Sequence, residues 1–192
     1  MISAILCTAR ERPGFREMAD SLVYNLNQCP EISFELIVVD KLLWSDENAV
    51  SFRRKELAEA VNGRFSYRHV APKPCAWQGP NRKTKQDYYA LNNARNTGTA
   101  LARGQHIILF DDCSVLAPNW LMWHGRAADK HIAVCGSFRS FTTAKVENGM
   151  IVDGVLHPSG VDHRGTELKA GHGGWMYGLN ISFPLAWALK IN

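Results

Sequence analysis

The chain has 192 residues, of which 46% are hydrophobic and 21% charged, and these ordinary proportions exclude a disordered chain. The formal net charge of +4 is too small to indicate a nucleic-acid partner by itself. The five cysteines contain no CxxC pair, so neither a disulfide framework nor a zinc site is expected. No apolar run approaches the about 20 residues needed to cross a bilayer, and the N-terminus lacks the pattern of a signal peptide. We therefore expect one folded domain in the reducing cytoplasm.

The first 130 residues alternate between apolar runs typical of buried strands and amphipathic stretches typical of helices. Strands are predicted at 2–7, 34–39, 65–67 and 107–110. Helices are predicted to begin at Pro13, Asp46, Asp87 and Pro118, with the third ending before Gly104. Continuous apolar strands that alternate with helices indicate an α/β fold with a parallel sheet covered on both faces, in the doubly wound, Rossmann-like arrangement.

The pattern changes after Lys130. A strand is predicted at Ile132–Phe138, and Asn148-Gly149 indicates a hairpin turn within Val146–Val155. A loop rich in glycine and histidine follows, and then a last strand at Tyr177–Phe183 and a helix from Pro184. We find no internal repeat and no linker between domains.

Polar side chains follow three of the predicted strands. The first strand ends at Thr8-Ala9-Arg10, the second at Asp40 and the fourth at Asp111-Asp112. Because ligands of open α/β sheets bind beyond the carboxyl ends of the strands, we expect these groups to share one crevice. Adjacent carboxylates suit a hard divalent cation such as Mg²⁺ or Mn²⁺, although an aspartate after a strand is also a common turn residue or helix cap.

Several motifs of other nucleotide-binding and hydrolytic enzymes are missing. No GxGxxG follows the first strand, and neither GxxxxGK[ST] nor GxSxG occurs, which argues against dinucleotide dehydrogenases, P-loop enzymes and α/β-hydrolases. Four basic residues cluster in the proline-containing loop at 72–86. They form either a solvated surface or a cover over an anionic ligand or a polyanionic acceptor, and they are Lys73, Arg82, Lys83 and Lys85.

Four segments follow one another in a familiar order. They are Ile2–Arg10, Phe34–Asp40, the stretch from Asn93–Gly98 through Ile107–Asp112 to Pro118–Leu121, and the stretch from Gly173-Gly174-Trp175 to Pro184. Together they resemble the family-2 inverting glycosyltransferases with the GT-A fold, and the resemblance covers nearly the whole chain. It implies a single catalytic domain at 1–192 with a mostly parallel, mixed central sheet, a nucleotide-binding half at 1–115 and an acceptor-binding half at 116–192.

The resemblance also implies roles for individual residues. Thr8, Ala9 and Arg10 match the loop that holds the nucleotide, and Asp40 matches the carboxylate that contacts the base. The remaining matches are Arg95 as a donor-binding arginine, Asp111 as the residue near the ribose and Asp112 as the metal ligand.

The sequence departs from the family in two places. Cys113 stands where a third acidic residue is common, so His172 becomes the candidate for a second metal ligand, with a loop contact to acceptor or solvent as the alternative. The family's general base usually follows a segment like the one that ends at Asn192, which predicts that the chain is truncated at its C-terminus. Within the chain, Asp162 is the first candidate for the base, ahead of Asp153 and Glu167.

The resemblance implies metal-dependent transfer, with inversion, of a sugar from a nucleotide-diphosphate sugar, UDP-sugar first, to an acceptor hydroxyl. A glycan, a lipid-linked glycan, a protein and a nucleic acid all fit as acceptors. Two rival functions stay open at this stage. One is a sugar-phosphate nucleotidyltransferase on a similar fold, and the other is a catalytically incomplete module that binds a nucleotide sugar.

Overall fold

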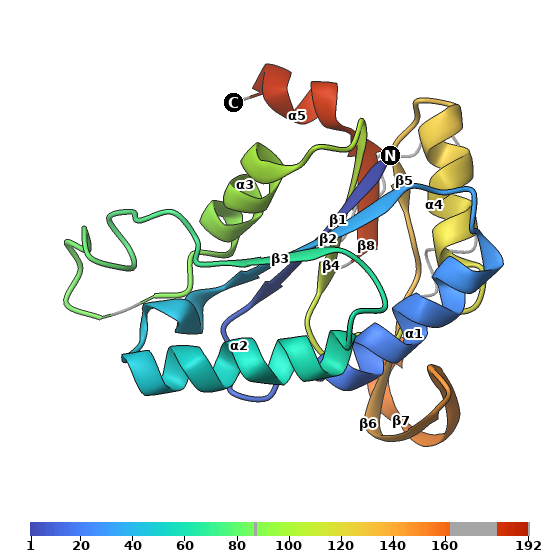
Figure 1. The fold of residues 1–192 in the computed structure, drawn as a ribbon, viewed down its shortest axis with the longest axis horizontal. Coiled ribbons are helices and arrows are strands. Elements are labelled where there is room, and N and C mark those ends of the chain that lie inside the picture. The colour runs from blue at the N-terminus through green and yellow to red at the C-terminus, as the bar shows by residue number, and fades with distance from the viewer. Residues whose placement is uncertain (87, 162–179, 192) are drawn as a thin grey trace.

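The computed structural model describes residues 1–86, 88–161 and 180–191. Figure 1 shows the fold. Its elements are, in chain order, β1 (Ile2–Thr8), α1 (Phe15–Gln28), β2 (Phe34–Asp40), the 3₁₀ helix η1 (Lys41–Trp44), α2 (Glu47–Val61), β3 (Tyr67–Val70), α3 (Leu91–Leu101), β4 (His106–Asp111), α4 (Trp120–Asp129), β5 (Val134–Cys135), β6 (Arg139–Glu147), β7 (Met150–Val161), β8 (Asn180–Pro184) and α5 (Leu185–Ile191). None of the helices in these ranges is long and apolar enough to cross a membrane.

The large sheet has the strand order β3-β2-β1-β4-β8-β5. The strands β1 to β4 pair in parallel, whereas β8 runs antiparallel to both β4 and β5. This confirms the α/β class and the mostly parallel, mixed sheet that the sequence predicts. Strand order reverses between β1 and β4, so a crevice is expected where their carboxyl ends diverge.

Two layers of helices cover the sheet, as the continuous apolar strands require. Side chains on one face of the sheet, such as those of Ala4 and Leu6 of β1, pack with α1, α2 and α4. Side chains on the opposite face, such as those of Ile5 and Cys7, pack with α3 and α5. All seven residues of β1 are buried, because this strand lies at the centre of the sheet between both helical layers.

Several element boundaries differ from the predicted ones. Helix α3 begins at Leu91 with Ala90 as its N-cap, so the predicted start at Asp87 is wrong; Asp87 itself lies outside the described residues. Strand β5 has only two residues, since the apolar run predicted as a strand pairs with β8 at Val134 and Cys135 alone. The Asp46 cap of α2 is confirmed by the bond from the backbone N–H of Ala49 to its carboxylate.

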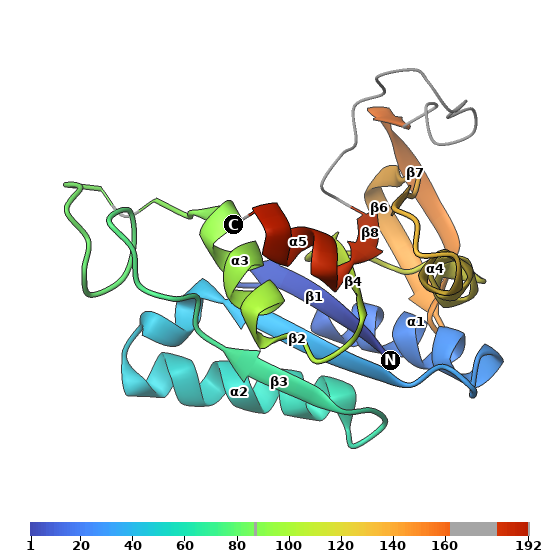
Figure 2. The same cartoon turned by 90° about the horizontal axis from the view of Figure 1, so that it is seen from above.

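The predicted hairpin is present and longer than predicted. Strands β6 and β7 turn at Asn148 and Gly149, whose positive φ values of 51° and 76° suit a two-residue turn. Figures 1 and 2 show this hairpin projecting from the large sheet. Its turn packs closely on α1, since a Cβ at Gly149 would lie 2.5 Å from the carbonyl oxygen of Asp20.

Replacing Gly98 of α3 by alanine is expected to destabilise the fold. The added Cβ would lie 2.4 Å from Cγ2 of Ile5, a fully buried residue of β1 that has no room to move. Overpacking of this kind costs about 1–3 kcal/mol, which exceeds the about 1 kcal/mol that alanine contributes as a better helix former. Urea denaturation of Gly98→Ala should show a net loss in the free energy of unfolding.

A helical glycine elsewhere supplies the matched control. In Gly125→Ala of α4, the new Cβ would meet only the tip of the Ile32 side chain, at 2.7 Å from Cδ1. That side chain can rotate away, so the free energy of unfolding of this variant should equal that of the wild type or exceed it by up to about 1 kcal/mol. A Gly98→Ala protein as stable as the wild type would contradict the close packing of α3 on β1.

Candidate functional site

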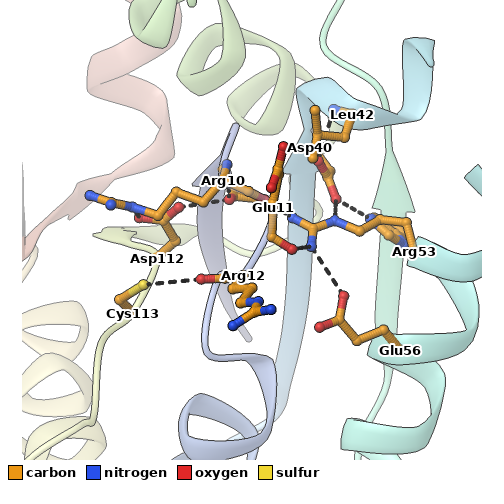
Figure 3. A network of polar contacts seen from close by, with 11 residues as sticks. Arg10, Glu11, Arg12, Asp40, Leu42, Arg53, Glu56, Asp112 and Cys113 are labelled. Carbon is orange, nitrogen blue, oxygen red and sulfur yellow. Dashed lines mark hydrogen bonds and ion pairs between the residues drawn. The ribbon is translucent and has the colours of Figure 1, made fainter. Parts of the chain in front are cut away.

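The carboxyl ends of β1 and β4 bring Thr8 and Asp112 together. The Thr8 hydroxyl donates to Oδ2 of Asp112 at 2.7 Å, and Arg10 Nε donates to Oδ1 at 3.0 Å. The backbone N–H of Arg10 also donates to the Thr8 hydroxyl at 3.2 Å. The end of β1 and the loop after it therefore hold both oxygens of Asp112. The Asp112 side chain is 11% exposed, while the Arg10 side chain is 66% exposed (Figure 3).

Asp111 lies beside this pair and faces helix α3. Arg95 Nη2 contacts Asp111 Oδ1 at 3.4 Å. Burial raises the pKa of Asp111, the charge of Arg95 opposes this rise, and the neighbouring Asp112 adds to it. The predicted carboxylate pair is therefore assembled with Arg10 and Arg95, and a cation placed between the carboxylates would relieve their mutual repulsion.

Cys113 turns the chain away directly after the carboxylates. It adopts a positive φ of 58°, its backbone N–H donates to the carbonyl of Pro13 at 2.9 Å, and its Sγ contacts the carbonyl of Arg12 at 3.6 Å. Desolvation, followed by the charge of Asp112, raises the pKa of the Cys113 thiol. A neutral thiol is a poor ligand for a hard cation, in agreement with the oxygen-based site expected here.

Asp40 lies at the same edge of the sheet, as predicted, but its carboxylate is fully buried. The backbone N–H of Leu42 donates to Oδ1 at 2.9 Å, and Arg53 Nε donates to Oδ2 at 2.7 Å. Nε2 of His69 lies 3.1 Å from the same Oδ2. Asp40 thus begins η1 as its N-cap and forms a buried ion pair with α2, and all of these contacts are with the protein itself.

Arg53 is a residue of this region that sequence reasoning missed. It sits on the predicted helix after Asp46, where an arginine is normally exposed, yet its side chain is 3% exposed. No signal in the sequence separates it from the exposed Arg54 that follows.

Tyr89 is a second residue that was missed. Its hydroxyl is buried, and within the described part of the chain it has no hydrogen-bond partner. Burial, and after it the nearby Cys7 and the Asp111–Asp112 pair, raises the pKa of Tyr89 far above its usual value. An aromatic pair just before a helix is typical of core packing, so its place beside the carboxylates could not be read from the sequence.

The remaining predicted residues are placed less completely. His172, Asp162 and Glu167 lie outside the described residues, and their predicted roles stay predictions. Asp153 is exposed on β7, where its Oδ1 accepts a bond from the N–H of Gly154. Across residues 1–86, 88–161 and 180–191 there is no group of three or more His, Cys, Asp or Glu side chains that could hold a metal.

Two hollows border the site. One, of about 340 Å³, lies between η1 and the basic loop; its lining includes Lys41, Trp44 and Arg82. The other is a groove of about 880 Å³ that runs from Cys113 between α1 and α2 to the β6–β7 hairpin. The basic loop is tied to α3, since the N–H of Lys73 donates to the Thr97 hydroxyl at 2.9 Å.

The parallel strands β3-β2-β1-β4, continued by the antiparallel β8, define the GT-A, Rossmann-like fold of glycosyltransferases. The same fold is found in TarS of S. aureus. TarS 1–349 matches with a TM-score of 0.52 and 16% identity, over 76% of this chain and 38% of that one. The chain therefore spans well under half the length of the relative it matches.

Two further structures of TarS 1–349 match in the same way, at 16% identity and over 76% of this chain. The complex with UDP matches with a TM-score of 0.51 over 38% of that chain, and the complex with UDP-GlcNAc with 0.50 over 36%. The sequence matches no protein-family model and no curated protein. At this level of identity, the similarity establishes the fold.

Removing the charge of Asp111 is expected to stabilise the protein at neutral pH. Because its folded-state pKa is raised, the ionised carboxylate costs stability above the usual carboxyl range, and that cost disappears when the pH falls below about 4. Thermal unfolding of Asp111→Asn should give a higher Tm than the wild type at pH 7, with the difference shrinking toward pH 4. Glu31→Gln, at an exposed carboxylate before β2, should show no such gain.

Replacing Tyr89 by phenylalanine should also stabilise the protein in the absence of ligand. A buried hydroxyl without a partner costs about 1–3 kcal/mol, and phenylalanine removes it without changing the ring. Chemical denaturation should show a gain in the free energy of unfolding, whereas Tyr88→Phe, at a residue that is 49% exposed, should change little. A loss of stability in Tyr89→Phe would mean that the hydroxyl has a partner in solution.

Proposed function

We propose that this chain binds a nucleotide-diphosphate sugar, with UDP as the nucleotide, and transfers the sugar to an acceptor hydroxyl. The observation that carries the proposal is the assembly around Asp112, whose two oxygens are held by Thr8 and Arg10 at the carboxyl edge of a GT-A sheet. Structures of the same fold, those of TarS, contain UDP and UDP-GlcNAc. An Asp pair between two arginines is suited to a diphosphate that carries a cation.

The donor set at this edge fits a Mn²⁺ or Mg²⁺ ion. Asp112 and Asp111 offer carboxylate oxygens, the ligands that these cations prefer, and the raised pKa of Asp111 marks a place where added positive charge is favourable. Asp112 is the proposed ligand, with Asp111 beside it toward the ribose and His172 as the proposed second ligand. When bound, such an ion supplies charge neutralisation for the departing diphosphate.

The arginines flanking the pair have matching roles in this proposal. Arg10 is mostly exposed and its guanidinium already reaches the site, so it can donate to a phosphate oxygen without a change of backbone. Arg95 approaches from α3, on the other side of the pair. Thr8, at the end of β1, and Ala9, in the loop after it, would lie against the nucleotide.

The proposed reaction is a single displacement at the anomeric carbon of the sugar. A bond forms between the acceptor oxygen and this carbon while the bond to the diphosphate oxygen breaks, and the nucleoside diphosphate leaves with the electron pair. The proton of the acceptor hydroxyl passes to a carboxylate base, for which Asp162 is the proposed residue within the chain. One displacement inverts the anomeric centre.

The acceptor is proposed to approach along the groove that begins at Cys113. This groove continues from the residue directly after Asp112 to Ala144 and Val146 of the hairpin, so it connects the carboxylate pair with the second half of the chain. Its lining carries four glutamates, including Glu56 and Glu59, against two arginines, and this excess of negative charge favours a neutral or cationic acceptor group over a polyanion.

Asp112→Asn is expected to abolish metal-dependent binding of UDP. The wild type should bind UDP more tightly with Mn²⁺ than without it, and the variant should lose this difference, weakening binding by tenfold or more, about 1.4 kcal/mol. Isothermal titration with UDP, with and without Mn²⁺, measures both quantities. Glu31→Gln, far from the carboxylate pair in sequence and exposed, serves as the control and should bind like the wild type.

Turnover assays separate the rival functions. Release of UDP from UDP-GlcNAc supports glycosyl transfer, whereas release of pyrophosphate from a nucleoside triphosphate and a sugar phosphate would replace it by nucleotidyl transfer. Metal-dependent binding of UDP without release from any sugar donor would show a binding module. Equal binding by wild type and Asp112→Asn would contradict the site itself.

A further inference from the structure

The buried side chain of Arg53 reaches from α2 to the loop after β1. Its Nη1 donates to the carbonyl of Glu11 at 2.9 Å, and its Nη2 donates to the carbonyl of Arg10. Its Nε donates to Asp40 at 2.7 Å (Figure 3). One guanidinium therefore joins two consecutive carbonyls of the loop to the end of β2.

Two further contacts fix the orientation of this guanidinium. Nη1 also lies 3.1 Å from Glu56 Oε2, one turn along α2, and the guanidinium carbon lies 4.9 Å from the centre of the Phe15 ring. Because every nitrogen of the planar group has an oxygen partner, its position leaves the loop little freedom.

The loop held in this way carries the residue that contacts Asp112. The carbonyl of Arg10 accepts a bond from Arg53, its backbone N–H donates to the Thr8 hydroxyl, and its side chain donates to Asp112. A change at Arg53 would therefore act on Asp112 through the backbone of Arg10, although no contact joins Arg53 to Asp112 among the described residues.

The contacts of Asp40 point to the same role. Its carboxylate is 0% exposed, and its oxygens are engaged by Leu42, Arg53 and His69. Because the carboxylate is fully buried, a ligand atom could reach it only if a group packed around it moved, and displacement of Arg53 would leave an uncompensated charge in the core.

We propose that Asp40 and Arg53 are positioning residues that hold the Arg10–Glu11 loop in its binding conformation, and that the Asp40 carboxylate does not select the base. The inference rests on the proposed function in so far as the loop binds a nucleotide. A positioning role and a direct contact with the base predict different ratios of UDP to CDP affinity. A carboxylate that accepts from N3–H of uracil favours UDP over CDP, whereas a carboxylate that positions the loop favours neither.

The first measurement needs no nucleotide. Hydrogen exchange of the backbone amides at 9–12 should be faster in Arg53→Gln and Arg53→Lys than in the wild type, because neither variant reproduces the fork that holds both carbonyls. Arg54→Lys, at the exposed neighbour on α2, is the matched control and should exchange like the wild type. Unchanged exchange in folded Arg53→Lys would overturn the proposal.

The second measurement is the ratio of UDP to CDP affinity with Mn²⁺. If the ordered loop is populated one tenth of the time, both dissociation constants rise about tenfold and their ratio stays constant. Asp40→Asn and Arg53→Lys should both behave in this way. A change in the ratio in Asp40→Asn but not in Arg53→Lys would instead show a direct contact with the base and would overturn the proposal.

The outcomes distinguish the two proposals. A wild type that binds neither nucleotide would contradict the proposed function, while the exchange measurement would still decide whether Arg53 holds the loop. If Arg53→Gln fails to fold, Arg53→Lys keeps the charge and serves for both measurements.

Discussion

The ion pair between Asp40 and Arg53 is the interaction on which the geometry of the site depends. A buried charge pair repays its desolvation only when the remaining polar atoms are also bonded, and here the loop carbonyls of Arg10 and Glu11, together with Glu56, complete the set. The need to satisfy one buried guanidinium thus brings β2, α2 and the loop after β1 to a single point. Removing either partner would leave the other charged and buried, so loop and core are coupled.

The parallel sheet explains why this point lies next to the carboxylates. In β1 and β4 the apolar middle of each strand is buried between two helical layers, and the polar groups that can face a ligand follow at the carboxyl ends. Thr8 pairs with Asp40 across β2, and Cys7 pairs with Asp111 across β4. The register of three strands therefore places Val39, Cys7 and Asp111 in one row and Asp40 and Thr8 in the next, and Asp112 directly follows Asp111.

The sequence allowed the fold and the carboxylate pair to be predicted for the same reason. Continuous apolar strands can be buried only in a two-sided parallel sheet, and the polar residues that end them must gather at one edge. It did not allow the prediction of Arg53, because a buried arginine has the same local pattern as an exposed one and differs only through its tertiary partners. The predicted length of β5 was wrong for a related reason. An apolar run forms a strand only where a neighbouring strand offers backbone groups for hydrogen bonds, and β8 offers them only opposite Val134 and Cys135.

The backbone and the side chain of Arg10 have different roles in these contacts. Its backbone is fixed by Arg53 and Thr8, while its side chain remains 66% exposed and forms a charge-assisted bond to Asp112. In the proposed function, Asp112 would hold a cation in place of this guanidinium, and the Arg10 side chain would then be available to the diphosphate. Only a side chain needs to move for this exchange, and a site whose backbone is already in place loses less conformational entropy on binding than a loop that must order. In the proposed function, the buried Asp40–Arg53 pair would thus contribute to donor binding by keeping fixed the part of Arg10 that does not touch the donor.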